Sequence, residues 1–314
     1  MKRAFVFPGQ GSQAIGMGQE LAAAFPVARQ VFEEVDEALK QKLSRLMQEG
    51  PEADLTLTEN AQPALMAVSV AVVRVLEGEG GRRLSDMASY VAGHSLGEYS
   101  ALCAAGAFSL ADTARLLKRR GQAMQRAVPV GVGAMAALLG IELEPAQEAC
   151  KEAAQGQIVA VANDNGGGQV VISGHKEAVD RAIEAAKAKG CKRGMPLPVS
   201  APFHCPLMQP AADEMEEALQ SVTLAPPSVP VVANVLAADT SDPDTIRDLL
   251  VRQVTGLVRW RESVLFMKGQ GVEGLVEVGA GKVLSGLVKR IDKEMTGTAV
   301  NGPADIEALL KSLG

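Results

Sequence analysis

Aromatic residues are scarce in this chain. Phe, Trp and Tyr make up 3% of its 314 residues, with a single Trp. Alanine, glycine, valine and leucine must therefore supply most of the core, which favours a layered α/β architecture. A chain of this length forms either one large domain with an insertion or two domains.

Cysteine pairs, a secretion signal and a long apolar run are also missing. The four cysteines are scattered with no C-x-x-C pair, and the basic residues 1–3 precede an apolar stretch too short for a signal sequence. The longest apolar runs, near residues 65–73 and 131–141, fall short of the roughly 20 residues that a transmembrane helix needs. We therefore expect a soluble protein of the reducing cytoplasm that does not enter a membrane.

Basic charge is in deficit, with 31 Lys and Arg against 37 Asp and Glu, a net charge of −6. This balance argues against nucleic acid as a partner, and any anionic ligand must meet a local basic patch. A glycine-rich turn lies at residues 9–18, but it matches neither G-x-G-x-x-G nor a Walker loop. The turn can instead offer a backbone N–H to an oxyanion above a sheet.

The sequence Gly93-His94-Ser95-Leu96-Gly97 stands between an apolar segment typical of a buried strand, 88–92, and an Ala- and Leu-rich segment typical of a helix, 98–107. Strand, Gly-x-Ser-x-Gly and helix together form the pattern of a nucleophile elbow. The glycines allow a sharp turn that leaves no room for flanking Cβ atoms. A glycine-flanked helix cap is the alternative interpretation.

Strands and helices alternate before residue 129 and after residue 198, which predicts a mainly parallel sheet covered on both faces. Between them, strands are expected at 133–141, 157–162, 169–173 and 192–199, with helices at 144–154 and 176–189. Residues 163–168 are expected to form a loop. The order βαββαβ is that of a ferredoxin-like unit. We therefore predict a large domain of residues 1–128 and 199–314, and an inserted ferredoxin-like small domain of residues 129–198.

A serine nucleophile needs a general base, and histidine fits best. The chain has three histidines. His94 is expected to point away into the sheet, and His175 to lie at the start of a helix in the small domain. His204, in a proline-bounded loop returning to the large domain, is the base by elimination; the alternative is a loop histidine with no catalytic task. The acid of a hydrolase triad would fall within the insertion, so a Ser95–His204 dyad is the more economical prediction, with His204 oriented by a backbone carbonyl or an amide.

Four motifs in order resemble one family. They are Gly9-Gln10-Gly11-Ser12-Gln13, Gly93-His94-Ser95-Leu96-Gly97-Glu98, Pro202-Phe203-His204 and Val278-Gly279-Ala280-Gly281-Lys282. Together they are similar to the malonyl-CoA:acyl carrier protein transacylases of bacterial type II fatty acid synthesis, over nearly the whole chain. The resemblance implies an α/β fold: an α/β-hydrolase-like large domain with a mainly parallel sheet, and an inserted ferredoxin-like (βαββαβ) small domain.

The resemblance also implies the site. Ser95 is expected to carry the acyl group, with His204 as its base and the backbone amides of Gln10 and Leu96 as the oxyanion hole. Arg120 is expected to hold the malonyl carboxylate. Gln253 is expected to help orient His204. The chain departs from the family at Leu257, where Pro is usual, and at Ala280, where Pro is usual, so the support of His204 is the uncertain part.

The reaction implied by the resemblance is ping-pong transfer of malonyl from malonyl-CoA to acyl carrier protein through an ester on Ser95. Neither a cofactor nor a metal is expected, and the chain is expected to act as a monomer. A serine esterase or thioesterase shares the elbow and is the alternative enzyme. A carrier-binding protein with an inactive elbow is the alternative outside enzymes.

Overall fold

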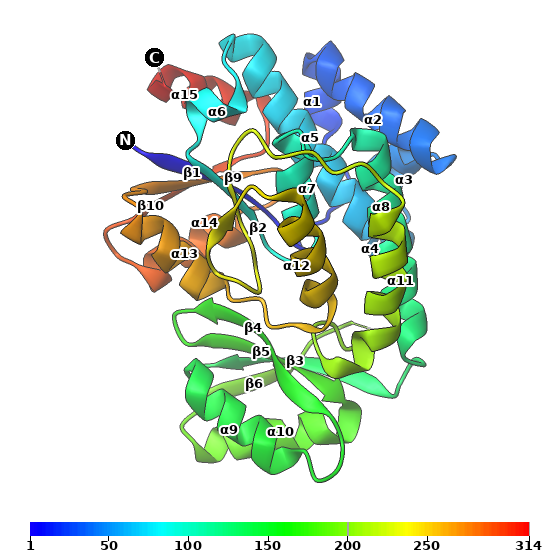
Figure 1. Cartoon of the computed structure of the whole chain (residues 1–314), viewed down its shortest axis with the longest axis vertical. Coiled ribbons are helices and arrows are strands. Elements are labelled where there is room, and N and C mark those ends of the chain that lie inside the picture. The colour runs from blue at the N-terminus through cyan, green and yellow to red at the C-terminus, as the bar shows by residue number, and fades with distance from the viewer. Residues whose placement is uncertain (200, 314) are drawn as a thin grey trace.

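The computed structural model describes residues 1–199 and 201–313. Ser200 and Gly314, both within the expected large domain, lie outside the described residues. Two sheets organise the fold, as Figure 1 shows. One has six strands in the order β10-β9-β1-β2-β7-β8, and the other has four in the order β4-β5-β3-β6.

The larger sheet is parallel except at one edge. Its parallel strands are β1 (Arg3–Phe7), β2 (Tyr90–Gly93), β7 (Val231–Val232), β9 (Gly274–Val278) and β10 (Thr296–Val300). The edge strand β8 (Asp239–Thr240) pairs antiparallel with β7. Because parallel strands all end at the same edge, the segments after Phe7 and Gly93 lie side by side there.

Helices cover both faces of this sheet, and the strand residues alternate between the two layers. Phe5, Phe7 and Val91 pack into one core cluster, whereas Ala4, Val6 and Ala92 pack into the other. The first layer holds α1 (Gln19–Ala24), α2 (Pro26–Leu39), α3 (Leu43–Glu49), α4 (Glu52–Thr56), α5 (Thr58–Gly80), α6 (Leu84–Met87), α7 (Gly97–Ala104), α8 (Leu110–Ala127), η1 (Pro206–Met208), α11 (Gln209–Gln220), α12 (Pro243–Thr255) and α15 (Pro303–Leu313). The second layer holds α13 (Trp260–Gly269) and α14 (Val283–Ile291).

Helix α5 is the one helix of the described chain that is long and apolar enough, by length and composition alone, to cross a membrane. Within its most apolar window, 83% of the residues are buried in the fold. Its composition therefore matches its position between α2, α7 and α8 in the core.

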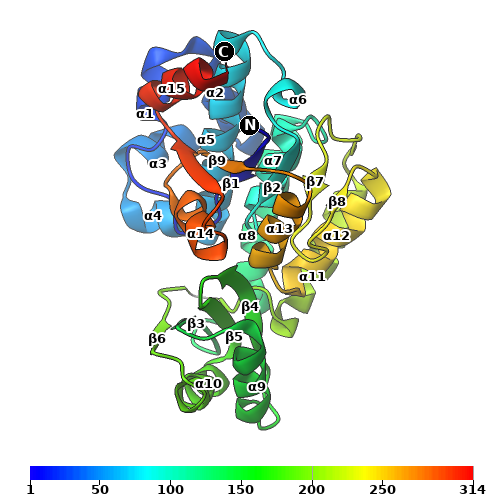
Figure 2. The same ribbon diagram turned by 90° about the vertical axis from the view of Figure 1, so that its left-hand side faces the viewer.

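The smaller sheet is built from a continuous part of the chain in the order β3-α9-β4-β5-α10-β6. Its elements are β3 (Gly133–Leu139), α9 (Leu143–Ala153), β4 (Val159–Gly166), β5 (Gln169–His175), α10 (Lys176–Ala188) and β6 (Arg193–Pro196). The strands are antiparallel, and α9 and α10 pack together on one face, away from the larger sheet in Figure 2. A separate core cluster lies between these helices and the sheet.

Strand β4 is longer than expected. Residues 163–166 continue the strand through two irregularities in register instead of forming an open loop. Asn163, Asp164 and Asn165 are all buried there. Their polar side chains had indicated a turn, but contacts with the larger part of the fold hold them extended.

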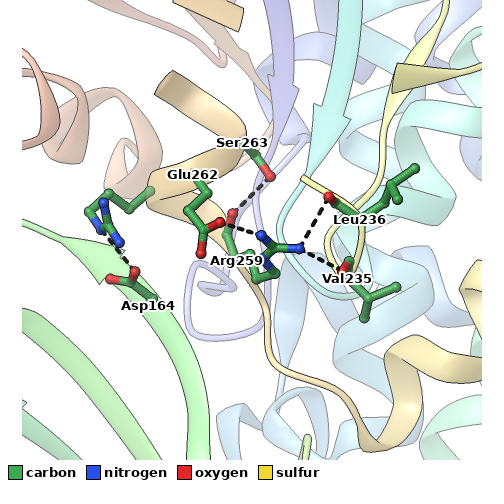
Figure 3. Close-up of polar contacts among 7 residues, drawn as sticks. Asp164, Val235, Leu236, Arg259, Glu262 and Ser263 are labelled. Atoms are coloured by element: carbon green, nitrogen blue, oxygen red, sulfur yellow. Dashed lines mark hydrogen bonds and ion pairs between the residues drawn. The ribbon is translucent and has the colours of Figure 1, made fainter. Parts of the chain in front are cut away.

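These contacts come from the segment leading into α13. Val258 N–H donates to the carbonyl of Ala162 at 2.9 Å, and Asp164 N–H donates to the carbonyl of Val258 at 3.0 Å. The Asp164 carboxylate, 2% exposed, also pairs with Arg261 at 2.9 Å. Figure 3 shows Asp164 on β4 facing this segment. The smaller sheet is therefore joined to α13 and the segment before it by backbone hydrogen bonds and a buried carboxylate.

The same segment also holds the loop that follows β7. The guanidinium of Arg259 donates to the carbonyls of Val235 at 3.3 Å and Leu236 at 3.2 Å (Figure 3). The N–H of Arg259 donates to the carbonyl of Asn234 at 3.1 Å. The backbone of Asn234 is thus held by Arg259, independently of the contacts that the Asn234 side chain makes at the elbow.

Candidate active site

The turn after β2 has the geometry of a nucleophile elbow. Ser95 has φ 55°, a left-handed conformation that costs roughly 1–3 kcal/mol in a residue other than glycine. A Cβ on Gly93 would lie 1.9 Å from the backbone carbonyl carbon of Gly97, and one on Gly97 would lie 2.3 Å from the carbonyl oxygen of Phe7. Both positions therefore require glycine, as the sequence pattern predicted.

Ser95 and His204 meet at this turn. Ser95 Oγ lies 2.7 Å from His204 Nε2, and His204 Nδ1 lies 2.8 Å from the backbone carbonyl of Gln253. Since a carbonyl only accepts, Nδ1 carries the proton and Nε2 is free to accept from the serine hydroxyl. The group that orients the His204 ring is thus the backbone carbonyl of Gln253. This contact is present although Leu257 stands where the family usually has Pro.

Burial keeps this histidine neutral. His204 is 3% exposed, and desolvation, with the positive charge of Arg120, lowers the pKa of His204 to about 3. At neutral pH the imidazole is therefore unprotonated at Nε2 and ready to accept a proton.

Arg120 brings a buried positive charge to the serine. It is 1% exposed, and its Nη2 donates to Ser95 Oγ at 3.2 Å and to Gln253 Oε1 at 2.8 Å. Its Nη1 donates to Gln62 Oε1 at 2.9 Å, and the guanidinium lies 5.6 Å from the centre of the Tyr99 ring. Desolvation lowers the pKa of Arg120, but an arginine stays charged at neutral pH.

The two basic residues beside Arg120, Lys118 and Arg119, each form an ion pair. Lys118 pairs with Glu59 at 2.7 Å and is 21% exposed, and Arg119 pairs with Glu214 at 3.0 Å. Both charges are thus committed elsewhere on the fold. Arg120 is the member of the cluster that reaches Ser95.

Three further polar residues, Asn234, Gln253 and Glu98, complete the site, and of these only Gln253 was predicted as a site residue. Asn234 Oδ1 accepts from Ser95 N–H at 2.9 Å, and Gln253 Nε2 donates to the Ser95 carbonyl at 2.9 Å. Glu98, 1% exposed, accepts from Asn234 N–H at 2.9 Å and from Gln253 Nε2 at 3.2 Å. Burial raises the pKa of Glu98 to about 7.

Leu96 and Gln10, whose backbone amides were predicted to form the oxyanion hole, both line the cavity at Ser95. Neither backbone amide has a hydrogen-bond acceptor within the described part of the chain. Leu96 also precedes the first turn of α7, so the positive end of that helix adds to the field at Ser95. Two amides of this kind can stabilise negative charge on a carbonyl oxygen.

His94 corrects another expectation. Its ring points toward the smaller sheet, where Nε2 lies 2.9 Å from Asn165 Oδ1, and it packs against Trp260. The ring therefore lies at the junction of the two parts of the fold and borders the cavity. With Nε2 engaged by Asn165, His94 is not the base of Ser95.

The cavity above Ser95 has a volume of about 380 Å³ and is walled by both parts of the fold. Met135, Val171 and Phe203 contribute apolar surface from one side, and Leu284 and Leu287 of α14 from the other. Apolar walls leading to a few convergent polar groups suit a slender, mostly uncharged arm with a polar end. No group of three or more His, Cys, Asp or Glu side chains suited to a metal ion occurs among the described residues.

Comparison with known proteins places this geometry in one group. The family described as "Acyl transferase domain" matches residues 4–302. The malonyl CoA-acyl carrier protein transacylase of Escherichia coli (strain K12) is 51% identical over 308 residues, which cover 98% of each chain.

Two solved structures are similar throughout. The acyl-carrier-protein-S-malonyltransferase of Bartonella henselae is 56% identical with a TM-score of 0.98, and all of both chains is covered. A malonyl-transacylase solved in complex with its type II PKS acyl-carrier protein is 48% identical with a TM-score of 0.96, over 99% of this chain and 100% of that one.

Proposed function

The chain belongs to the acyl transferase family, and from this membership we propose that it is a malonyl-CoA:acyl carrier protein transacylase of bacterial fatty acid synthesis. It moves a malonyl group from coenzyme A to the phosphopantetheine thiol of acyl carrier protein. The single observation that carries the assignment is the Ser95–His204 pair at 2.7 Å with the buried Arg120 guanidinium 3.2 Å from the same hydroxyl. The nucleophilic oxygen of Ser95 therefore contacts both a base and a cation that can pair with a carboxylate.

In the first half-reaction, His204 Nε2 takes the hydroxyl proton of Ser95 while Oγ attacks the thioester carbonyl. The amides of Leu96 and Gln10 stabilise the oxyanion of the tetrahedral intermediate. When the carbon–sulfur bond breaks, the coenzyme A sulfur takes the proton from His204. The products are free coenzyme A and a malonyl ester on Ser95.

The second half-reaction runs the same steps in reverse with a different thiol. His204 takes the proton of the phosphopantetheine thiol, whose sulfur attacks the ester carbonyl. Cleavage of the carbon–oxygen bond returns the proton to Ser95 Oγ. The protein thus ends the cycle in its starting protonation state, and no cofactor takes part in either step.

Arg120 chooses the substrate in this proposal. A malonyl group differs from an acetyl group by one carboxylate, which is costly to desolvate without a partner. A guanidinium can bind both carboxylate oxygens in a fork, and Gln62 and Gln253 fix that of Arg120 by accepting from Nη1 and Nη2. Gln253 supports His204 as well, through its backbone carbonyl.

The elbow alone also fits a serine esterase or thioesterase. A buried arginine at the nucleophile and the absence of a carboxylate from the two contacts of the His204 ring favour the transferase. An esterase would transfer the malonyl group from Ser95 to water, whereas the transferase holds the ester until a thiol arrives.

The test is the intact mass of the protein after incubation with malonyl-CoA. The wild type should gain one malonyl group and lose it on addition of holo acyl carrier protein. Ser95→Ala should gain none, and His204→Ala should acylate slower by about 10² to 10⁴. Malonylation of Ser95→Ala at the wild-type rate, or loss of the ester to water before carrier protein is added, would contradict the proposal.

The two separate sheets and their separate core clusters support a division of the chain. We propose that residues 1–128 and 199–314 form an α/β-hydrolase-like catalytic domain and that residues 129–198 form a ferredoxin-like small domain. The protein acts in the cytoplasm as a monomer.

A further inference from the structure

Glu98 is a buried carboxylate next to the reacting serine, and the transfer mechanism gives it no task. The described chain buries two other carboxylates, and each has a partner of its own: Asp164 pairs with Arg261, and Glu277 accepts from the first amides of α14. Glu98 instead contacts two residues of the active site. Burial of such a group is unfavourable unless it is satisfied by hydrogen bonds.

A single oxygen of Glu98 receives both of these hydrogen bonds. Oε2 accepts from the backbone N–H of Asn234 at 2.9 Å and from Nε2 of Gln253 at 3.2 Å. Asn234 is also held by Gly93 and by Arg259, so its position does not depend on Glu98 alone. Within the described residues, the side-chain amide of Gln253 is hydrogen-bonded only to Ser95, Glu98, Asn234 and Arg120, all of which belong to the site.

The side-chain amide of Gln253 acts as a donor through its nitrogen and as an acceptor through its oxygen. Its nitrogen faces three acceptors, namely the Ser95 carbonyl, Glu98 Oε2 and Asn234 Oδ1, at 2.9, 3.2 and 3.3 Å. Its oxygen accepts from Arg120 Nη2 at 2.8 Å. A flipped amide would direct an oxygen at three oxygens and an NH₂ group at a guanidinium.

We propose that Glu98 is a positioning residue for substrate choice: it fixes the side-chain amide of Gln253 so that its oxygen holds Arg120 for the malonyl carboxylate. The proposal rests on the proposed function, and it deepens that function by adding a residue that touches neither substrate nor the reacting atoms. His204 depends on the backbone carbonyl of Gln253 and not on this amide. Loss of the Glu98 contact should therefore affect selection of malonyl more than acyl transfer itself.

Two substitutions of Glu98 separate the effect of its hydrogen bonds from the effect of its charge. Glu98→Gln can turn its amide oxygen into the place of Oε2 and so keeps both hydrogen bonds without the charge. Glu98→Asp keeps the charge but withdraws the carboxylate by one methylene from a contact that is already 3.2 Å long. Glu98→Ala removes both. Asp36→Asn is a matched control, because its carboxylate accepts from Ser44 outside the site.

The experiment measures kcat/KM of each variant for malonyl-CoA and for acetyl-CoA. The ratio of malonyl to acetyl should fall roughly tenfold in Glu98→Asp and Glu98→Ala, about the value of one hydrogen bond to a charged group. It should stay within about threefold of wild type in Glu98→Gln and in Asp36→Asn.

Equal losses for both substrates in Glu98→Asp, or a ratio in Glu98→Gln as low as in Glu98→Asp, would overturn the positioning role. If Glu98→Ala does not fold, the Asp and Gln pair decides the question alone. Wild-type protein that is not malonylated at all would contradict the proposed function, which is a separate outcome.

Discussion

Arg120 is the residue whose removal should separate substrate choice from acyl transfer. Loss of a buried charge-assisted pair is worth about 2 to 5 kcal/mol, so Arg120→Ala should lower kcat/KM for malonyl-CoA by roughly one and a half to more than three decades. Acetyl-CoA should be used as well as before or better. Arg120→Lys should recover only part of the loss, because an ammonium cannot fork across a carboxylate. Equal losses with malonyl-CoA and acetyl-CoA in steady-state assays would make Arg120 structural.

The same residue contributes to the lowered pKa of His204. Desolvation and then the charge of Arg120 lower the pKa of His204 to about 3, so wild-type acylation should keep its base unprotonated far below pH 6.5. Arg120→Ala removes the second cause and therefore raises the pKa. A raised pKa means protonation at a higher pH, so the acid limb of kcat/KM for acetyl-CoA should move upward. An acid limb at the same pH in both proteins would contradict this assignment.

Sequence patterns were sufficient to predict that Ser95 and His204 meet, although 109 residues separate them. A strained elbow requires its glycines, and a chain with three histidines leaves few bases. The sequence patterns did not predict that Asn234 or Gln62 contributes to the site. An amide side chain in a segment without a motif carries no local signal, and its role arises only when the fold brings it to Ser95 or Arg120.

At the scale of single elements, the turn between β2 and α7 should tolerate no side chain at its glycines. In Gly93→Ala the new Cβ would meet the backbone of Gly97 at 1.9 Å, and in Gly97→Ala that of Phe7 at 2.3 Å, so the elbow cannot adjust by moving a flexible side chain. Each should destabilise the protein by about 3 kcal/mol or more, a value typical of severe overpacking. Urea unfolding monitored by the single Trp measures this loss.

Gly78→Ala is the control for these substitutions. Gly78 lies in α5 with nothing within 4 Å of its new Cβ, so alanine should stabilise the helix by roughly 0.5–1 kcal/mol. Destabilisation of equal size at Gly78 and Gly93 would show that the effect is not specific to the elbow.

Elements with a clear period or a boundary signal were predicted close to their observed limits. The helices expected at 144–154 and 176–189 are observed as α9 (Leu143–Ala153) and α10 (Lys176–Ala188). Strand β4 was predicted too short, since Asn163 to Gly166 carry residues typical of turns. Their strand conformation depends on Val258, nearly 100 positions away, and on the ion pair to Arg261. No local pattern records such a contact.

At the scale of the whole molecule, the net negative charge of the chain opposes the binding of an acidic carrier protein. The chain carries −6, and acyl carrier proteins are acidic, so docking requires basic residues that are concentrated and uncommitted. Seven basic residues on the two parts of the fold are candidates: Lys187, Lys189, Lys192, Arg193, Lys282, Lys289 and Arg290. The structure divides this set in two.

Lys187 and Lys189 are the committed members. Lys187 pairs with Glu184 at 2.7 Å, and Lys189 pairs with Glu148 and Glu152 on α9. Both lie on or beside α10, on the side of the smaller sheet that faces away from the larger one (Figure 2). Their charges are balanced within the small part of the fold.

The remaining five are exposed and have no ion pair within the described chain. Lys282, Lys289 and Arg290 lie on or beside α14, whose other face borders the cavity through Leu284 and Leu287. Arg290 adjoins the turn at Gly167, and Lys192 adjoins Gly140 close by. A basic strip therefore runs from α14 to the end of the smaller sheet, beside the cavity that a phosphopantetheine arm would enter.

Charge reversal should tell the two groups apart. Lys289→Glu with Arg290→Glu should raise the apparent KM for carrier protein several-fold at low salt and weaken its salt dependence, because exposed charges act through steering and are screened by ions. The rate of malonylation by malonyl-CoA should be unchanged, since Ser95 and its partners are untouched. Lys187→Glu with Lys189→Glu is the matched control and should leave the KM near wild type. An equal rise in both double variants would mean that the carrier senses only net charge, and an unchanged KM in the α14 variant would place docking on another surface.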